Sequence, residues 1–177
     1  MCIRDRPYND AFDTPAALDE AGMAKIIADF IAATKRADEI GFEVVEIHMA
    51  HGYLMHQFLS PLSNQRNDEY GGALEGRMRF PLEVFAAVRQ AWPRHKALGV
   101  RISATDWVDS SSWDVGEASQ FTAALKAAGA TEWADAQKDY DTHELLGRGV
   151  PPSASAAVSS AGLGPWAAYS SSCTGSA

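Results

Sequence analysis

The sequence predicts an α/β protein in which helices alternate with parallel strands. Residues 23–40 repeat apolar side chains at helical spacing, and the short β-branched run 42–49 follows at once. The same order recurs with a helix over 74–92 and a strand over 98–103, and a third helix extends to Lys126. Strands that alternate with helices in this way are typical of parallel βα units.

The first helix carries both an apolar stripe and the signals that begin and end a helix. Asp19 is placed to cap its amino end, and Gly41 follows its carboxyl end. The stripe, at i, i+3, i+4, i+7, i+8 and i+11, consists of Met23, Ile26, Ile27, Phe30, Ile31 and Thr34. The next residues, "FEVVEIHM", are short and rich in β-branched side chains, which predicts a strand.

The second and third helices have similar signals. Pro81 lies inside the second and should bend it or mark a restart, because proline lacks the N–H that continues a helix. The side chains expected to face inward from this helix are Met78, Phe85, Val88 and Trp92. Asp114 and Glu117 form a D-x-x-E capping pair for the third helix, and Gly129 lies past its end.

The composition divides the chain into three segments. Residues 1–6, "MCIRDR", join abruptly to the segment that begins at residue 7 and are interpreted as a non-native leader. Residues 7–130 have the pattern of a folded protein. A third strand should begin near 131, but "TEWADAQKDYDTHELLGRG" has neither apolar alternation nor a β-branched run, so none is predicted. Residues 131–177 are interpreted as a low-complexity tail, either natural or frameshifted; we favour a frameshift because the pattern stops in mid-unit.

Charge and composition limit the classes of function. The net charge of −8 and the pI near 5.0 argue against a nucleic-acid or anionic-membrane surface. No segment approaches the roughly 18–20 apolar residues that span a bilayer. Cys2 and Cys173 form no CxxC motif, which suits a reducing compartment. We therefore expect a cytoplasmic protein that handles small molecules, with neither nucleic acid nor membrane as a partner.

The segment "HMAHGYLMHQF" concentrates candidate site residues, with His48 at the carboxyl end of the first strand. Parallel α/β folds place ligands at this end of their strands. Three imidazoles, those of His48, His51 and His56, could bind a metal, although their spacing matches no common zinc motif. They could instead be structural. A third possibility is a site in which two imidazole N–H groups hold a carbonyl oxygen while Tyr53 donates a proton.

The run "GFEVVEIHMAHGYLMHQFLSPLSNQRNDEYGG", followed by "RMRFPLEV" and "GVRISATDW", closely resembles the flavin oxidoreductases of the old yellow enzyme family. The bacterial ene-reductases that carry "SPLSN" are the most similar group. The resemblance covers roughly residues 12–130. It implies a partial TIM (β/α)8 barrel made of the middle βα units only, with FMN and NAD(P)H as cofactors. In this family, hydride passes from NAD(P)H to the flavin and then from flavin N5 to an activated alkene, such as an enone or a nitroalkene.

The resemblance also implies roles for individual residues. His48 and His51 align with the pair that hydrogen-bonds the carbonyl or nitro oxygen of the substrate, and Tyr53 aligns with the proton donor. Arg101 aligns with the arginine beside flavin N1 and O2, where negative charge grows on reduction. His56 is expected to belong to the scaffold, and no metal site is expected. A preorganised donor at a developing enolate oxygen is worth on the order of 3 kcal/mol, which gives these assignments a physical reason.

The segment "SNQRNDEYGG" is interpreted as structural. Its polar members, expected to form a hydrogen-bonded loop brace, are Asn64, Arg66, Asp68 and Tyr70, with Gly71 and Gly72 forming the turn. Two features depart from the family pattern. Gly76 replaces the usual asparagine, and a helix glycine costs about 1 kcal/mol, which would weaken the brace. The segment "DSSSWD", 109–114, is longer than in relatives.

These observations predict that the parent protein is an FMN-dependent ene-reductase, homo-oligomeric in its full-length form. A barrel of this type needs about 250 residues, so this polypeptide is expected to be an inactive fragment. One alternative is a small metal-binding or interaction module built on the histidine cluster, without flavin. Another is a barrel that performs other chemistry on the same scaffold, since a fold does not determine a function.

Overall fold

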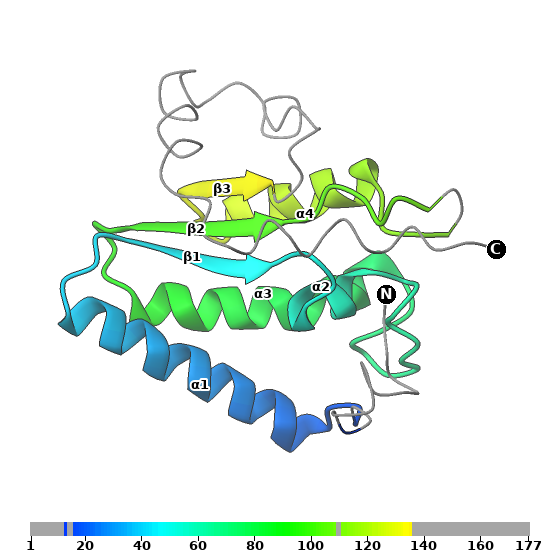
Figure 1. The fold of residues 1–177 in the computed structure, drawn as a ribbon, viewed down its shortest axis with the longest axis horizontal. Coiled ribbons are helices and arrows are strands. Elements are labelled where there is room, and N and C mark those ends of the chain that lie inside the picture. Colours follow the sequence, from blue (N-terminus) through cyan, green and yellow to red (C-terminus); the bar gives the residue numbers. More distant parts are fainter. Residues whose placement is uncertain (1–12, 14–15, 109–110, 136–177) are drawn as a thin grey trace.

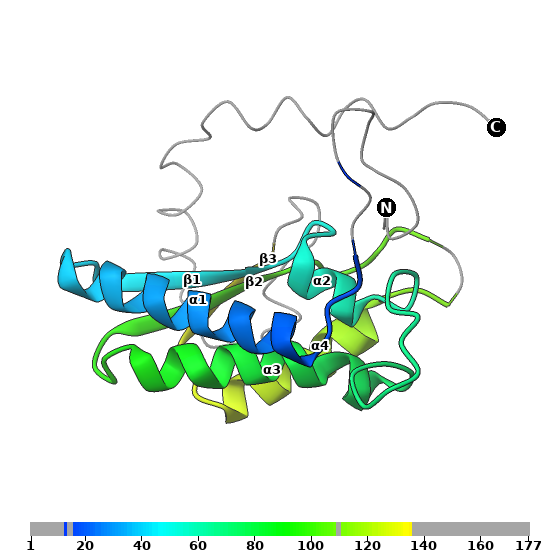
Figure 2. The ribbon, with the colours of Figure 1, turned by 90° about the horizontal axis from the view of Figure 1, so that it is seen from below.

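The computed structural model describes residues 13, 16–108 and 111–135, with side chains as far as Thr131. They contain a parallel sheet with strand order β1-β2-β3, and α1, α3 and α4 lie on the same face of it (Figures 1 and 2). The elements are α1 (Glu20–Glu39), β1 (Val44–Met49), α2 (Leu54–Leu59), α3 (Leu74–Ala91), β2 (Ala97–Ile102), α4 (Val115–Ala127) and β3 (Glu132–Asp135). The predicted alternation of helices and parallel strands is confirmed. No described helix is long and apolar enough to cross a membrane.

The ends of α1 and α4 lie where the sequence predicted them. The Asp19 carboxylate accepts a hydrogen bond from the Gly22 N–H (2.7 Å), and the Asp114 carboxylate accepts one from the Glu117 N–H (2.9 Å). Beyond the carboxyl ends, Gly41 and Gly129 have φ values of 88° and 100°, which glycine adopts without a steric penalty. Local capping chemistry is therefore sufficient to place both helices.

The second predicted helix, α3, is one continuous element through Pro81, so Pro81 does not mark a restart. Packing explains why the helix continues. Pro81 is itself buried, and Phe80 and Val84 beside it are fully buried in the core. Burial of large apolar side chains, worth about 1.5–3 kcal/mol each, offsets the hydrogen bond that proline cannot make.

The prediction that no strand follows Gly129 is wrong, because β3 pairs in parallel with β2. Gly99 lies opposite Glu132, and Ile102 lies opposite Asp135. Pairing with the edge of β2 makes this segment extended although it lacks the alternation of a typical strand. The predicted boundary at 130 thus falls directly before a strand of the sheet. The predicted leader and residues 136–177 of the predicted tail lie outside the described residues.

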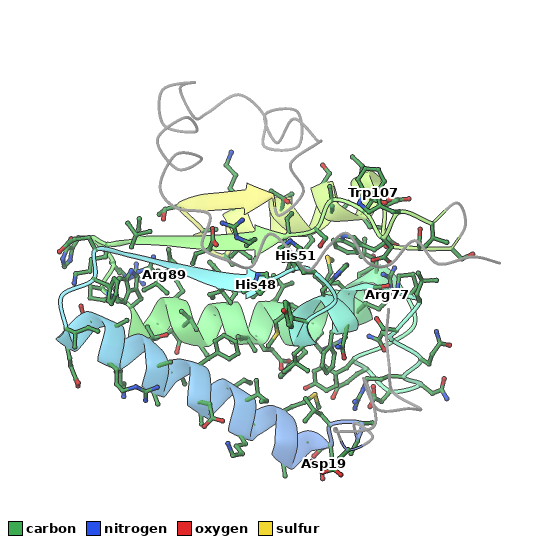
Figure 3. All side chains as sticks on the ribbon, in the orientation of Figure 1. Asp19, His48, His51, Arg77, Arg89 and Trp107 are labelled. Carbon is green, nitrogen blue, oxygen red and sulfur yellow. The ribbon has the colours of Figure 1, made fainter. Side chains whose placement is uncertain are left out.

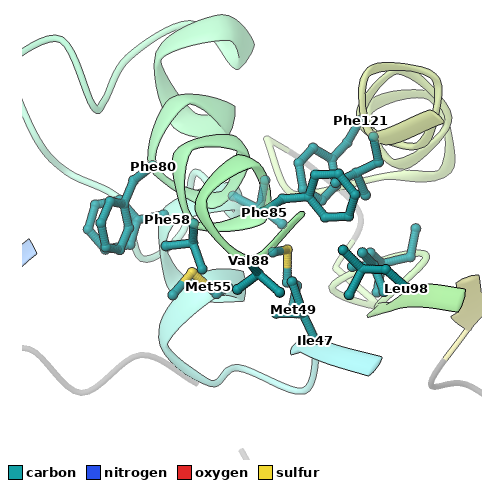
Figure 4. Packing of buried hydrophobic residues seen from close by; sticks show 14 of the residues in the cluster. Ile47, Met49, Met55, Phe58, Phe80, Phe85, Val88, Leu98 and Phe121 are labelled. Atoms are coloured by element: carbon teal, nitrogen blue, oxygen red, sulfur yellow. The ribbon is translucent and has the colours of Figure 1, made fainter. Parts of the chain in front are cut away.

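The core lies between the helices and one face of the sheet (Figure 4). In β1 the side chains alternate as predicted: Ile47 and Met49 are buried among the helices, whereas Glu46 and His48 are exposed on the opposite face. The buried cluster includes Phe58, Phe80, Phe85, Val88, Leu98 and Phe121. One face of the sheet therefore provides stability, and the other carries polar side chains that are open to ligands.

The loop brace between α2 and α3 is present as predicted. Its amide donor, Asn64 Nδ2, bonds the carbonyl oxygens of Phe58 (2.7 Å) and Tyr70 (2.8 Å). Arg66 pairs with Asp68 through both carboxylate oxygens. These bonds fix the chain that leads out of α2 and connect it to the start of α3.

Gly76 contributes to this loop in a way that the sequence did not reveal. A Cβ at Gly76 would lie 2.2 Å from the carbonyl oxygen of Gly71, so the loop backbone approaches α3 too closely for any side chain. The buried guanidinium of Arg77 then bonds the carbonyl oxygen of Gly72 and pairs with Glu117 on α4. The glycine permits this close packing of loop and helix, instead of simply weakening the brace.

Candidate active site

His48, His51 and Tyr53 gather at the carboxyl end of β1. The ring centroids of His48 and His51 are 5.1 Å apart, and those of His48 and Tyr53 are 5.2 Å apart. Figure 3 shows His48 and His51 beside the arrowhead of β1. The three predicted side chains are therefore neighbours, with His48 on the strand and the other two on the chain that leads into α2.

The chain that carries His51 leaves the strand in an unusual conformation. His51 has a φ of 60° and Gly52 a φ of 74°, so two successive residues lie in the left-handed region. Such a conformation is uncommon for a residue with a side chain and persists only where surrounding contacts hold it. The His51 N–H donates to Ser103 Oγ (3.0 Å), which connects this turn to the end of the neighbouring strand β2.

The electrostatic surroundings of His48 favour its neutral form. Partial burial lowers its pKa below the ordinary value of 6.5, and the neighbouring His51 and Arg101 lower it further, against the opposing effect of Glu46. A neutral imidazole has one N–H donor and one acceptor nitrogen. At neutral pH, His48 is therefore suited to donate a hydrogen bond to a polarised oxygen without carrying a charge itself.

Tyr53 lies on the open side of the site. It is 60% exposed and precedes α2, where its side chain makes no capping bond. An exposed phenol at this position can reach a ligand held against the two imidazoles. A phenol has an O–H donor, so Tyr53 is a candidate proton donor.

Arg101 lies on the same face of the sheet as His48 and directly opposite it in the register of β1 and β2. Its Nε atom donates to Glu46 Oε1 at 2.7 Å, and both side chains are about one-third exposed. A cation fixed in this way suits the edge of a flavin ring that becomes negative on reduction. The sequence did not reveal the partner, although Glu46 precedes His48 by two residues on the same face.

His56 is held by contacts with the surrounding fold. It is buried, its Nδ1 atom accepts a hydrogen bond from the Gly52 N–H (2.8 Å), and its Nε2 atom lies 3.0 Å from Asp106 Oδ1. Burial and these contacts agree with its expected place in the scaffold. Within the described part of the chain, no group of three or more His, Cys, Asp or Glu side chains could hold a metal ion. The three histidines therefore do not form one ligand set.

A pocket of about 320 Å³ opens beside His51. Its lining also includes His56, Ser60, Leu62, Ser103, Asp106 and Trp107. Sequence reasoning missed Ser103 and Asp106, although both lie in the segment that follows β2, at the edge of the sheet where the predicted site residues also lie. Position after a strand was the one signal that could have identified them.

Comparisons with known proteins identify the family of the chain. The sequence profile of the NADH:flavin oxidoreductase / NADH oxidase family matches residues 6–147. An NADPH dehydrogenase of Clostridium acetobutylicum is 54% identical over 100 residues, which cover 56% of this chain and 30% of that protein. An NADH:flavin oxidoreductase of Gibberella zeae is 52% identical over 95 residues, which cover 54% of this chain and 23% of that protein.

Solved structures of related enzymes are also similar to this chain. A morphinone reductase in complex with tetrahydroNAD superposes with a TM-score of 0.64 and 30% identity, covering 76% of this chain and 38% of that one. An old yellow enzyme homologue from Zymomonas mobilis gives a TM-score of 0.62 and 27% identity, covering 70% and 35%. The chain thus spans about one-third or less of the length of the curated relatives named above. Its βα units are part of the TIM-barrel fold, and the chain belongs to the NADH:flavin oxidoreductase / NADH oxidase family.

Proposed function

We propose that this chain forms the substrate-activating part of an FMN-dependent NAD(P)H oxidoreductase that reduces activated C=C bonds in small molecules. The observation that carries this proposal is the convergence of His48, His51 and Tyr53 at the carboxyl end of β1. Membership of the family supports the redox chemistry. Enones and nitroalkenes are the substrates that the three side chains suit, and the parent enzyme is proposed to be cytoplasmic and homo-oligomeric.

In this proposal, the two imidazoles polarise the substrate. His48 and His51 donate hydrogen bonds to the carbonyl or nitro oxygen, where negative charge develops as the alkene is reduced. The lowered pKa of His48 supports a neutral donor. Two such donors fixed before the reaction stabilise the charge without reorganisation, an effect worth about 3 kcal/mol for each donor.

The remaining assignments concern the proton and the cofactor. Tyr53 donates the proton to the α-carbon from the open side of the site. Arg101, whose Nε atom donates to Glu46, would hold the N1 and O2 edge of the FMN ring. When bound, FMN supplies the hydride for the β-carbon of the alkene, having taken it from NAD(P)H.

A chimeric enzyme tests the proposal. The aligned segment of the Clostridium acetobutylicum NADPH dehydrogenase is replaced by the matching residues of this chain, and NADPH-dependent reduction of cyclohexenone is measured. Replacing both His48 and His51 by alanine should lower kcat/KM by about 10²-fold or more, because each lost donor removes roughly 3 kcal/mol of oxyanion stabilisation. Tyr53→Phe should lower kcat by about 10²-fold or more, because it removes the proton donor.

The control is Gln65→Ala, an exchange of an exposed loop residue outside the site, which should leave the rates unchanged. A chimera that folds, retains FMN and oxidises NADPH but does not reduce the alkene would contradict the substrate class. Full activity in the variant without His48 and His51 would contradict their proposed role.

A further inference from the structure

The turn that carries His51 and Gly52 depends on partners that lie outside it. Both residues have positive φ values, and their N–H groups point to different parts of the fold. The His51 N–H donates to Ser103 Oγ, whereas the Gly52 N–H donates to Nδ1 of His56 (2.8 Å). Since the ordinary preference of His51 opposes this conformation, such hydrogen bonds are what hold it.

The hydrogen bond from Gly52 identifies the tautomer of His56. A ring nitrogen that accepts a hydrogen bond carries no proton, so the proton of a neutral His56 is on Nε2. This atom lies 3.0 Å from Asp106 Oδ1, close enough for an electrostatic contact although not aligned as a hydrogen bond. The carboxylate next to Nε2 favours the same tautomer and leaves Nδ1 available to the turn.

Asp106 is itself held in place and in its ionised form. Its Oδ2 atom accepts hydrogen bonds from Ser60 Oγ (2.6 Å) and from the Trp113 N–H (3.0 Å). Burial opposes ionisation, but the contacts with His56, Ser60 and the Trp113 N–H outweigh it and lower the pKa of Asp106. A continuous set of contacts therefore runs from the loop after β2, through one imidazole, to the backbone between His51 and Tyr53.

A histidine buried only for packing would not show this pattern. His56 does contact the Trp113 ring edge-on, with centroids 6.4 Å apart, and an apolar ring could make that contact equally well. An apolar ring could not accept the Gly52 N–H. The acceptor at Nδ1 is therefore the property of His56 that connects it to the site.

We propose that His56 is a positioning residue of the alkene-reduction site. Its Nδ1 atom holds Gly52, and it thereby keeps His51 and Tyr53, on either side of Gly52, turned toward His48. The identity of the site rests on the proposed function above, whereas the contact itself is a property of the fold and can be tested without substrate.

Nuclear magnetic resonance of the full ¹⁵N-labelled chain tests the proposal. Long-range spectra of the wild type should show His56 as the Nε2–H tautomer. His56→Phe keeps a ring but removes the acceptor, and amide exchange of Gly52 should accelerate about fivefold, the ratio expected for one net hydrogen bond. The cross-relaxation between the His48 ring and those of His51 and Tyr53 should weaken in the same variant.

Two further variants separate positioning from packing. His56→Asn places an amide oxygen near the position of Nδ1 and should restore slow exchange at Gly52, although it fills the space less well than phenylalanine. Thr122→Val removes a buried hydroxyl that bonds the Ala118 carbonyl in α4, and it should leave the Gly52 signal unchanged.

Three results would overturn the proposal. They are an Nδ1–H tautomer of His56 in the wild type, equal rates of Gly52 amide exchange in the wild type and His56→Phe, and a wild-type spectrum typical of an unfolded chain. An inactive chimera alongside the expected Gly52 behaviour would contradict the proposed function and leave the role of His56 in the turn standing.

Discussion

At the scale of single residues, the surroundings of His48 make a measurable prediction. Because burial, His51 and Arg101 all disfavour its charged form, His48 should titrate below 6.5 in the folded chain. Arg101→Gln removes a cation and should raise the midpoint, whereas Glu46→Gln removes an anion and should lower it further. The ring-proton shifts of His48, followed by NMR between pH 4 and 8, measure both changes.

The two substitutions are matched, since each removes one member of the same ion pair and leaves an amide in its place. Shifts of the titration midpoint with the same sign in both variants would show that the ion pair acts on His48 through structure instead of charge.

In the folded state, a lowered pKa makes protonation of His48 unfavourable. Its contribution to stability is therefore present above pH 6.5 and declines as the pH falls below that value.

The sequence was sufficient to predict that the candidate site residues close together in the chain are neighbours. It was insufficient to predict their partners from other parts of the chain. Strand alternation and strand polarity placed His48, whereas His51 and Tyr53 follow it in the exit loop, and the family resemblance implied the role of each. The contacts of Glu46 with Arg101 and of His56 with Asp106 join residues about 50 positions apart. Such pairs depend on the register between strands, which no local pattern in one sequence encodes.

At the scale of elements, the sequence predicted the helices that have local signals and missed the elements that depend on tertiary contacts. The helices with a capping aspartate, α1 and α4, were predicted at both ends because their signals lie within a few residues. The short elements α2 and β3 were missed. A six-residue helix and a four-residue strand have too few residues to show a period, and β3 exists through pairing with β2.

Gly76 provides a test of how the loop brace and α3 fit together. Alanine is the better helix former by about 1 kcal/mol, but its Cβ would lie 2.2 Å from the Gly71 carbonyl oxygen. We expect Gly76→Ala to lower the free energy of unfolding by about 1–3 kcal/mol, as overpacking does. Urea denaturation followed by circular dichroism measures the change.

The matched control is Gly116→Ala in the first turn of α4. There the nearest atom to the added Cβ is a side-chain oxygen of Asp114 at 3.2 Å, which can move slightly. This variant should be as stable as the wild type or slightly more stable. If Gly76→Ala behaved in the same way, the close approach of the loop to α3 would not be a constraint in solution.

At the scale of the whole molecule, the described strands form an open sheet instead of a closed barrel. They number three, whereas a TIM barrel has eight. The face that carries Glu46, His48 and Arg101 is partly exposed, and the apolar side chain of Val44 on the same face is 50% exposed. In a closed barrel this face would be surrounded by other strands, which exclude water and strengthen electrostatic contacts with a cofactor.

This difference predicts that the polypeptide alone does not retain FMN. An exposed Arg101 holds the polar N1 and O2 edge of the flavin ring weakly in water, because electrostatic contacts at the surface are screened by solvent and salt. Purified chain mixed with FMN should emerge from gel filtration without visible flavin absorbance, whereas the chimera, which completes the barrel, should carry one FMN per chain. Stoichiometric flavin on the isolated chain, together with NADPH oxidation, would show instead that these βα units assemble a working site by themselves, for example through association of several copies.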